Sequence, residues 1–299
     1  MGFGLSYPMT AVALRSWAPL GAAAVQSTLA LGLITLLALL RVLPRPSLHA
    51  CTRPGLVRLS VLCLLGGVGF IAGMNIAVGL VGPTITGFVA TLYAVFAALL
   101  AVPLLGERLR AGTLASFVLA LVGTLMLAGF QPAAESVVGI LFGLMAAVCF
   151  GSYIVLSRRW AASARLDGTS ITMANLFGRG PILVVVQLLI DPAGLFPGYI
   201  EPASLVAMAG LVLLPSMMSQ LLLIASVRRV PARRTSAALL LVPLTSALVS
   251  LTILGERPTP MEGIGGVLVL IGIAGASGAV GAASQRFRPR VTAGPGTTT

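Results

Sequence analysis

The tetrapeptide Leu-Gly-Glu-Arg occupies residues 105–108 and returns at residues 254–257, 149 positions later. Each copy closes a long apolar stretch and precedes another one. Self-similarity at a long, fixed offset indicates an internal duplication. We therefore predict that the chain consists of two copies of one structural unit. Further residues that recur at this offset are Ala98 and Ala247, Leu99 and Leu248, and Gly123 and Gly272.

The composition places both copies in a membrane. Hydrophobic residues make up 58% of the 299-residue chain and charged residues only 9%, and the mean hydropathy is +1.05. Soluble domains are nearer 45–50% apolar and about 25% charged. A soluble fold of this composition would lack the polar surface to cover its apolar area. The sequence therefore predicts an all-α polytopic membrane protein.

The apolar sequence divides into ten stretches, most of them near the roughly 20 residues that a membrane-spanning helix needs. Gly82 and Pro83 predict a tight hairpin between the third and fourth stretches. Thr259, Pro260 and Glu262 form a capping-box pattern that predicts the start of the tenth helix. The predicted helices cover residues 1–14, 19–40, 59–80, 83–105, 111–130, 137–156, 170–190, 204–225, 236–254 and 263–281.

The arginines predict the orientation of these helices. All nineteen basic residues are arginine, and sixteen of them fall on alternate connections or on the C-terminal tail. The opposite connections hold Arg15 and Arg257, and Arg179 lies within the seventh helix. Because positive residues collect on the cytoplasmic side, both termini should face the cytoplasm, with the protein in the plasma membrane. The net charge of +12 is then a topology signal, and no nucleic-acid partner is expected.

Each unit contains five predicted helices, so the second unit must insert upside down relative to the first. Inverted repeats are a recurring design of secondary transporters, which bind substrate near the middle of the membrane where the repeats meet. We predict a first repeat over residues 1–132, a second over residues 133–283, and a disordered cytoplasmic tail over residues 284–299.

These units carry a family resemblance. Each has Gly-Glu at the end of its fourth helix and a glycine-rich fifth helix, and in this they resemble the EamA-type permeases of the drug/metabolite transporter (DMT) superfamily. The resemblance extends over about residues 4–283. It implies ten helices around a cavity lined mainly by helices one, three, four, six, eight and nine. It also implies transport of amino acids, other small metabolites or drugs, commonly outward.

The first predicted helix is short. Helix six begins about fourteen residues before Gly151, whereas only four residues precede Leu5, its counterpart at an offset of 146. We expect that the first helix is truncated and that Met1 lies inside it. The alternative is a genuinely short first helix that leaves a gap in the wall.

Polar and aromatic residues on the helices that the resemblance assigns to the cavity are candidates for substrate contact. Tyr7 and Tyr153 are equivalent at the offset of 146, which predicts opposite depths along one path. Interhelical hydrogen bonds and, for the tyrosines, an interfacial aromatic belt are the alternative roles. The candidates are Tyr7, Asn75, Thr91, Tyr93, Tyr153, Ser219 and Gln220.

Arg179 is the only charged residue deep within a predicted span. A charge at such a depth is costly and usually faces a cavity or a partner. Its planar fork suits a substrate carboxylate or phosphate. Carbonyls freed near Pro181 are the structural alternative, because proline interrupts the helical hydrogen bonds there.

The seven acidic residues all lie in loops or at helix ends. The absence of a carboxylate in the middle of the membrane disfavours simple carboxylate-coupled proton exchange, and it departs from the related small multidrug-resistance proteins, which depend on a membrane-embedded Glu. Glu107 and Glu256 are candidates for gating or ion coupling. Their alternative role is to stabilise the N-terminus of the following helix.

The sequence thus predicts a secondary transporter that moves small amino-acid-like or amphipathic solutes outward by alternating access, as a monomer or homodimer in the lipid bilayer. A multidrug or lipid-linked carrier is the alternative among transporters, and a non-transporting membrane scaffold is a third. No enzyme activity is expected, because an intramembrane enzyme needs ionisable groups clustered at one depth. One histidine and three cysteines without paired spacing predict no metal site and no cofactor.

Overall fold

The computed structural model describes residues 2–40, 53–106, 111–128, 134–164, 168–218, 241–255 and 259–284, and all regular structure within these ranges is helical. The α-helices are α1 (Gly2–Ala13), α2 (Pro19–Leu39), α3 (Arg53–Leu62), α4 (Phe70–Thr91), α5 (Tyr93–Leu105), α6 (Ala111–Ala128), α7 (Ala134–Ala164), α8 (Gly168–Ile190), α9 (Pro202–Leu211), α12 (Leu241–Val249) and α13 (Pro260–Ser284). Three π-helical turns continue α3, α9 and α12, and one 3-10 turn follows α8. They are η2 (Cys63–Gly69), η4 (Val212–Met218), η5 (Ser250–Leu254) and η3 (Pro192–Gly194).

Several of these helices have the length and apolar character of membrane spans. The long ones are Pro19–Leu37, Arg53–Leu105, Val137–Trp160 and Met173–Ile190. Shorter apolar helices cover Leu114–Thr124, Pro202–Ser216, Val242–Leu254 and Pro260–Gly275. The prediction of an all-helical chain with apolar helices is confirmed for the described residues, and the count of ten stays a prediction.

The predicted break at Gly82 and Pro83 is confirmed. Gly82 lies inside α4 with φ 78° and ψ 166°, in a region that a residue with a Cβ rarely adopts. The α7 residue Gly143 faces both Ala77 and Val89, which lie on opposite sides of the break. The two arms of α4 therefore double back and lie side by side against α7.

Helix α7 is longer than the sequence predicts. It runs from Ala134 to Ala164, beyond the predicted end at residue 156. The added residues include polar side chains, among them Ser157 and Arg158, that end the apolar stretch without ending the helix. Residues 157–167 contain no proline or glycine that would break the helix. The helix therefore continues beyond the point where the hydropathy falls.

The glycine of the repeated tetrapeptide has the same structural role in both copies. Gly106 ends α5 with φ 70° and ψ 19°, and Gly255 ends η5 with φ 70° and ψ 17°. Both are left-handed C-caps, for which glycine carries no steric penalty. The predicted capping box is also confirmed, since the Thr259 amide donates to the Glu262 carboxylate at 2.8 Å and the Glu262 amide donates to the Thr259 hydroxyl at 3.3 Å.

The offset of 149 also relates the helix boundaries. Helix α3 maps onto α9, and the turn η2 maps onto η4, residue for residue. The first residues of α2 and α8 are equivalent, as are those of α6 and α13. The two halves therefore share their local structure although few side chains match.

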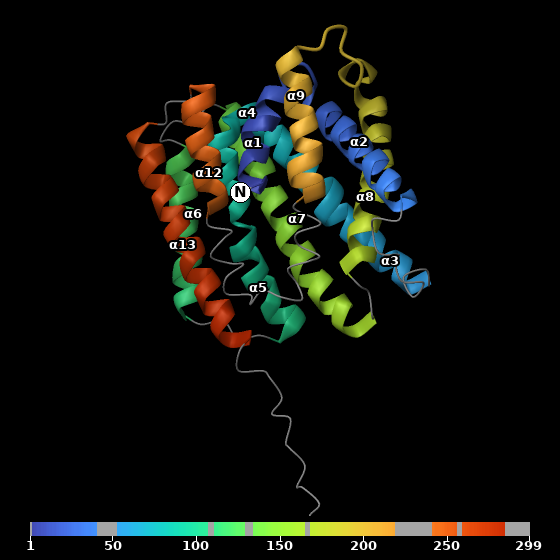
Figure 1. The fold of residues 1–299 in the computed structure, drawn as a ribbon. Coiled ribbons are helices and arrows are strands. Elements are labelled where there is room, and N and C mark those ends of the chain that lie inside the picture. The colour runs from blue at the N-terminus through green and yellow to red at the C-terminus, as the bar shows by residue number, and fades with distance from the viewer. Residues whose placement is uncertain are drawn as a thin grey trace, which may run out of the picture.

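Equivalent helices from the two halves pack against each other in antiparallel pairs. In one pair, Ser116 of α6 lies against Gly275 of α13 and Gly123 lies against Gly265. In the other, Gly21 of α2 lies against Gly194, just beyond α8, and Thr28 lies near Gly180. Figure 1 places α6 and α13 side by side at one flank of the molecule and α2 with α8 at the other. Gly123 of α6 and Gly265, Gly272 and Gly275 of α13 are thus used for close packing within the chain.

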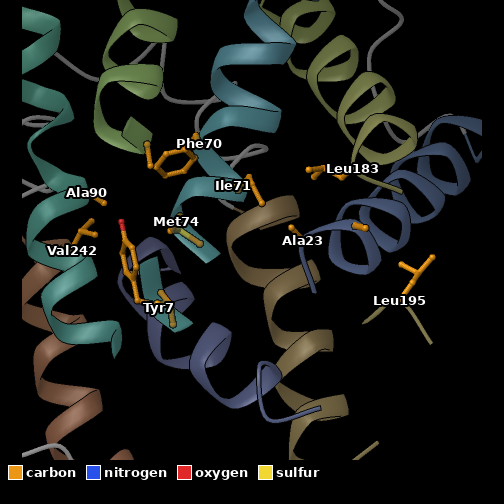
Figure 2. Close-up of a cluster of buried hydrophobic side chains, with 12 residues drawn as sticks. Tyr7, Ala23, Phe70, Ile71, Met74, Ala90, Leu183, Leu195 and Val242 are labelled. Carbon is orange, nitrogen blue, oxygen red and sulfur yellow. The ribbon is translucent and has the colours of Figure 1, made fainter. Parts of the chain in front are cut away.

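Helix α1 lies in the middle of the bundle, where it packs against α4, α9 and α12. A buried cluster surrounds it and joins elements from both halves. Figure 2 shows Tyr7 beside Met74, with its hydroxyl end directed toward Ala90 and Val242. The core of the fold is therefore also the place where the two halves meet.

Candidate functional site

Four aromatic rings, which we call the aromatic ladder, connect α4, α5 and α7. Phe150 of α7 stacks on Phe70 of α4 with ring centroids 4.4 Å apart. Tyr93 of α5 meets the same ring edge-on at 5.0 Å, and Tyr153 stacks on it at 5.6 Å. Offset and edge-on arrangements of this kind are the favourable ones for aromatic pairs. Two of the predicted tyrosines, Tyr93 and Tyr153, therefore contact one shared phenylalanine.

Tyr7 lies near this ladder. Its buried side chain belongs to the same core cluster as Phe70 and Met74, and it lies close enough to Tyr93 for electrostatic interaction between the two groups. Tyr153 packs with Leu59 and Leu62 in a separate cluster. The two equivalent tyrosines thus pack in different core clusters, and their opposite depths along one path stay a prediction.

Asn75 and Thr91 are buried but bond to backbone. The Asn75 amide donates to the Pro19 carbonyl at 3.2 Å, which ties α4 to the start of α2. The Thr91 hydroxyl donates to the Phe88 carbonyl at 2.7 Å within the same helix. The Asn75 bond is the interhelical role that the sequence left open, whereas the Thr91 bond lies within one helix. The oxygen of the Asn75 amide has no hydrogen-bond partner.

Arg179 lies in α8 with only 5% of its surface exposed. One Nη donates to the Ser216 hydroxyl at 3.4 Å, and Nε has no partner. No carbonyl and no carboxylate of the described residues accepts a hydrogen bond from the guanidinium. Freed helix carbonyls, the structural alternative for this residue, therefore do not satisfy it here. Within the described part of the chain, the buried guanidinium therefore has one long hydrogen bond, to a neutral hydroxyl.

Two amide side chains flank Arg179, and the offset of 149 relates them. Gln26 of α2 donates to the Leu211 carbonyl and to the Ser216 hydroxyl, both at 3.4 Å. Asn175 of α8 lies close enough to Tyr153 for a polar interaction between the two side chains. Both amides are buried, and the carbonyl oxygen of each has no partner. Tyr153 is thereby the link between the aromatic ladder and the polar groups.

The two equivalent π-helical turns enclose this polar group from opposite halves of the chain. In η4, Pro215 has no N–H for the carbonyl of Leu211, which accepts instead from the Ser216 hydroxyl at 3.1 Å. In η2, Gly67 leaves room for the Asn175 oxygen, and a Cβ there would also lie 3.0 Å from the Arg179 Cβ. Irregular π-turns inside helices recur at functional sites. Gly67 and Ser216 are equivalent at the same offset, so Arg179 lies between matched positions of the two halves.

We call Gln26, Ser27, Asn175, Arg179 and Ser216 the polar cluster. Ser27 is fully buried, and its backbone lies against Gly180. Four of the seven buried polar side-chain atoms without a hydrogen-bond partner in the described part of the chain belong to this cluster: Gln26 Oε1, Ser27 Oγ, Asn175 Oδ1 and Arg179 Nε. Native interiors leave few such atoms unsatisfied, so their concentration here points to a site.

Sequence reasoning found Arg179 and missed the other four members. The equivalence of Gln26 and Asn175 was visible at the offset of 149, although their burial was not. Four candidates of the sequence analysis, Glu107, Ser219, Gln220 and Glu256, lie outside the described residues. Within those residues, no three His, Cys, Asp or Glu side chains are grouped so that they could hold a metal ion.

Comparisons with known proteins agree with this architecture. One solved crystal structure of a protein has a TM-score of 0.61 and 23% sequence identity, over 92% of this chain and 96% of that one. At this identity the similarity shows the fold alone. No curated protein matches the chain. A model of the EamA-like transporter family matches the chain twice, over residues 1–129 and 137–278. The chain therefore belongs to the EamA-like transporter family and is a membrane-embedded transporter of small solutes.

Proposed function

We propose that the protein moves a small, amphipathic, amino-acid-like solute outward by alternating access. The observation that carries the proposal is the crossed contact between the two halves. Helix α8 of the second half packs against η2 of the first, and α2 of the first half packs against η4 of the second. In a carrier built from inverted repeats over residues 1–132 and 133–283, this is the contact that one repeat changes when it rocks against the other.

The chemistry beside this contact supports the cargo class. An aromatic ladder provides apolar contact area, two amides provide hydrogen bonds, and one arginine provides a positive charge. Ligand sites typically combine apolar walls with a few polar groups that fix orientation. A small solute with one apolar part and one polar end matches the aromatic wall and the polar groups.

One end of the bundle has the contacts expected of a closed gate. Arg15, in the turn after α1, pairs with Glu201 at 3.7 Å. The Glu201 amide donates to the Ser16 hydroxyl at 3.0 Å, and the Ser204 hydroxyl donates to the Val12 carbonyl at 2.8 Å. We propose that these contacts part when the protein opens toward the outside. The distribution of arginines assigns this end to the outer face of the plasma membrane, with both termini in the cytoplasm.

The test is a flux screen with purified protein in proteoliposomes. Panels of amino acids, other carboxylate metabolites, cationic drugs and lipid-linked compounds are loaded inside or outside. Flux of an amino-acid-like solute supports the proposal. Flux of drugs or lipid-linked compounds alone would establish the multidrug or lipid-linked alternative. An absence of both flux and binding across the panels would favour a scaffold.

A further inference from the structure

We propose that the polar cluster binds a solute carboxylate together with a hydrogen-bond donor next to it on the same molecule. The Arg179 guanidinium would receive the carboxylate, and the free oxygens of Gln26 and Asn175 would receive the donor. The assignment deepens the transporter function proposed above and rests on it, because it names which end of the cargo the protein holds and where.

The requirement for an anion follows from the surroundings of Arg179. A buried guanidinium is tolerated when its charge is paired and its N–H groups are bonded. Here one Nη reaches a hydroxyl at 3.4 Å, Nε has no partner, and no described carboxylate pairs with the group. A carboxylate fits the guanidinium fork with two parallel charge-assisted hydrogen bonds. The ligand would thus supply the negative charge that the described residues do not.

The requirement for a donor follows from the two amides. Gln26 Oε1 and Asn175 Oδ1 are acceptors without a partner, although both side chains are more than nine-tenths buried. An unsatisfied buried acceptor is costly, and an N–H or O–H group of the ligand removes that cost. The hydroxyl of Ser27, also without a partner, can donate or accept. A simple inorganic anion would satisfy the arginine and leave both amides unsatisfied.

The position of the cluster connects binding to movement. Gln26 and Ser27 come from the first half of the chain, whereas Asn175, Arg179 and Ser216 come from the second. A ligand that bonds to both sets is held between the parts that must move against each other. Its affinity therefore depends on their relative position, which is the differential binding that a ligand needs to shift a conformational equilibrium.

The experiment compares four probes on the full chain in lipid nanodiscs at equal ionic strength. Leucine has both a carboxylate and an ammonium group, 4-methylpentanoate has only the carboxylate, leucinamide lacks the carboxylate, and chloride is an inorganic anion. The readout is the rise of the midpoint temperature of unfolding, since a ligand that binds only the folded state stabilises it. Leucine should give the largest rise and 4-methylpentanoate a smaller one. Leucinamide and chloride should give none.

Substitutions test the roles assigned to Arg179 and Asn175. Arg179→Gln should abolish the effect of both carboxylates, and the matched control Arg158→Gln, at an exposed position of α7, should respond as the wild type does. Asn175→Ala should remove the advantage of leucine over 4-methylpentanoate while the carboxylate effect persists. If Arg179→Gln does not fold, Arg179→Lys keeps the charge without the fork and should weaken leucine binding by about tenfold or more.

Three results would overturn the assignment. They are no carboxylate-dependent stabilisation of the wild type, an unchanged response in the Arg179 variants, and a response to chloride equal to that of leucine. The flux screen is independent of these results. Carboxylate binding without any flux would refute transport and keep the site, whereas flux with binding independent of Arg179 would refute the site and keep transport.

Discussion

Tyr93 packs edge-on against Phe150, the ring that the aromatic ladder shares, and lies near Tyr7. We predict that Tyr93→Ala lowers solute flux by roughly tenfold or more, the size of effect that truncation of a buried aromatic anchor has on binding. Flux and membrane abundance are measured together in proteoliposomes. Tyr199→Ala is the matched control, because this tyrosine is 76% exposed in the loop before α9. Wild-type flux in Tyr93→Ala would remove this residue from the solute path.

The two glycines of the repeated tetrapeptide are also expected to contribute to stability as single residues. We predict that Gly106→Ala and Gly255→Ala each lower the free energy of unfolding by about 1 kcal/mol, because both have a positive φ that alanine adopts only with strain. Unfolding in lipid bicelles measures the change. Gly263→Ala is the control, since this α13 glycine has ordinary helical geometry with open space around it, and the substitution should be neutral or slightly stabilising. Equal effects at all three positions would contradict the role of the left-handed caps.

At the scale of elements, the contact between α6 and α13 depends on the absence of side chains. A Cβ built on Gly123 would lie 2.6 Å from the Gly265 carbonyl oxygen, which is backbone and cannot rotate away. We predict that Gly123→Ala costs about 1–3 kcal/mol, as overpacking of a close contact does. Thermal unfolding checks this, with Gly32→Ala of α2 as the control because nothing lies within 4 Å of its Cβ position. An unchanged midpoint in Gly123→Ala would mean that the two helices separate without loss of stability.

At the scale of the whole molecule, the proposed gate joins the turn after α1 to the start of α9. We predict that Arg15→Glu speeds amide hydrogen exchange around residues 11–18 and 199–206, because repulsion from Glu201 replaces attraction. The ion pair is partly exposed, so its loss should weaken local closure by no more than about 1 kcal/mol. The double variant Arg15→Glu with Glu201→Arg restores the pair and should restore slow exchange. Exchange that stays fast in the double variant would show that the charges do not hold this end closed.

The orientation of the chain is a second prediction at this scale. A fluorescent-protein fusion at the C-terminus should be fluorescent, and an alkaline phosphatase fusion at the same position should be inactive, since arginines collect on the cytoplasmic side. The two reporters in the opposite pattern would reverse the assignment and place the Arg15 and Glu201 gate on the cytoplasmic face.

Features set within one or two helical turns were predictable from the residues alone. The capping box at Thr259 and Glu262, the break at Gly82 and the ends at Gly106 and Gly255 depend on neighbours in the chain, and each appears in the structure. The apolar stretches are helices for the same reason, since lipid requires the backbone to satisfy its own hydrogen bonds. The end of α7 was predicted too early, because hydropathy falls where helix propensity continues.

The sequence by itself determined the membrane class, the family and the duplication, because composition and repeated turn residues can be recognised without knowing how the helices pack. Only the tertiary structure decided what Arg179 meets. Its contacts with Ser216 and the neighbouring bond between Gln26 and Ser216 join residues 37 and 190 positions apart. Whether a buried polar atom finds a partner depends on which helices pack together and on the irregular geometry of η2 and η4. That information arises from packing in three dimensions, and no single helix carries it.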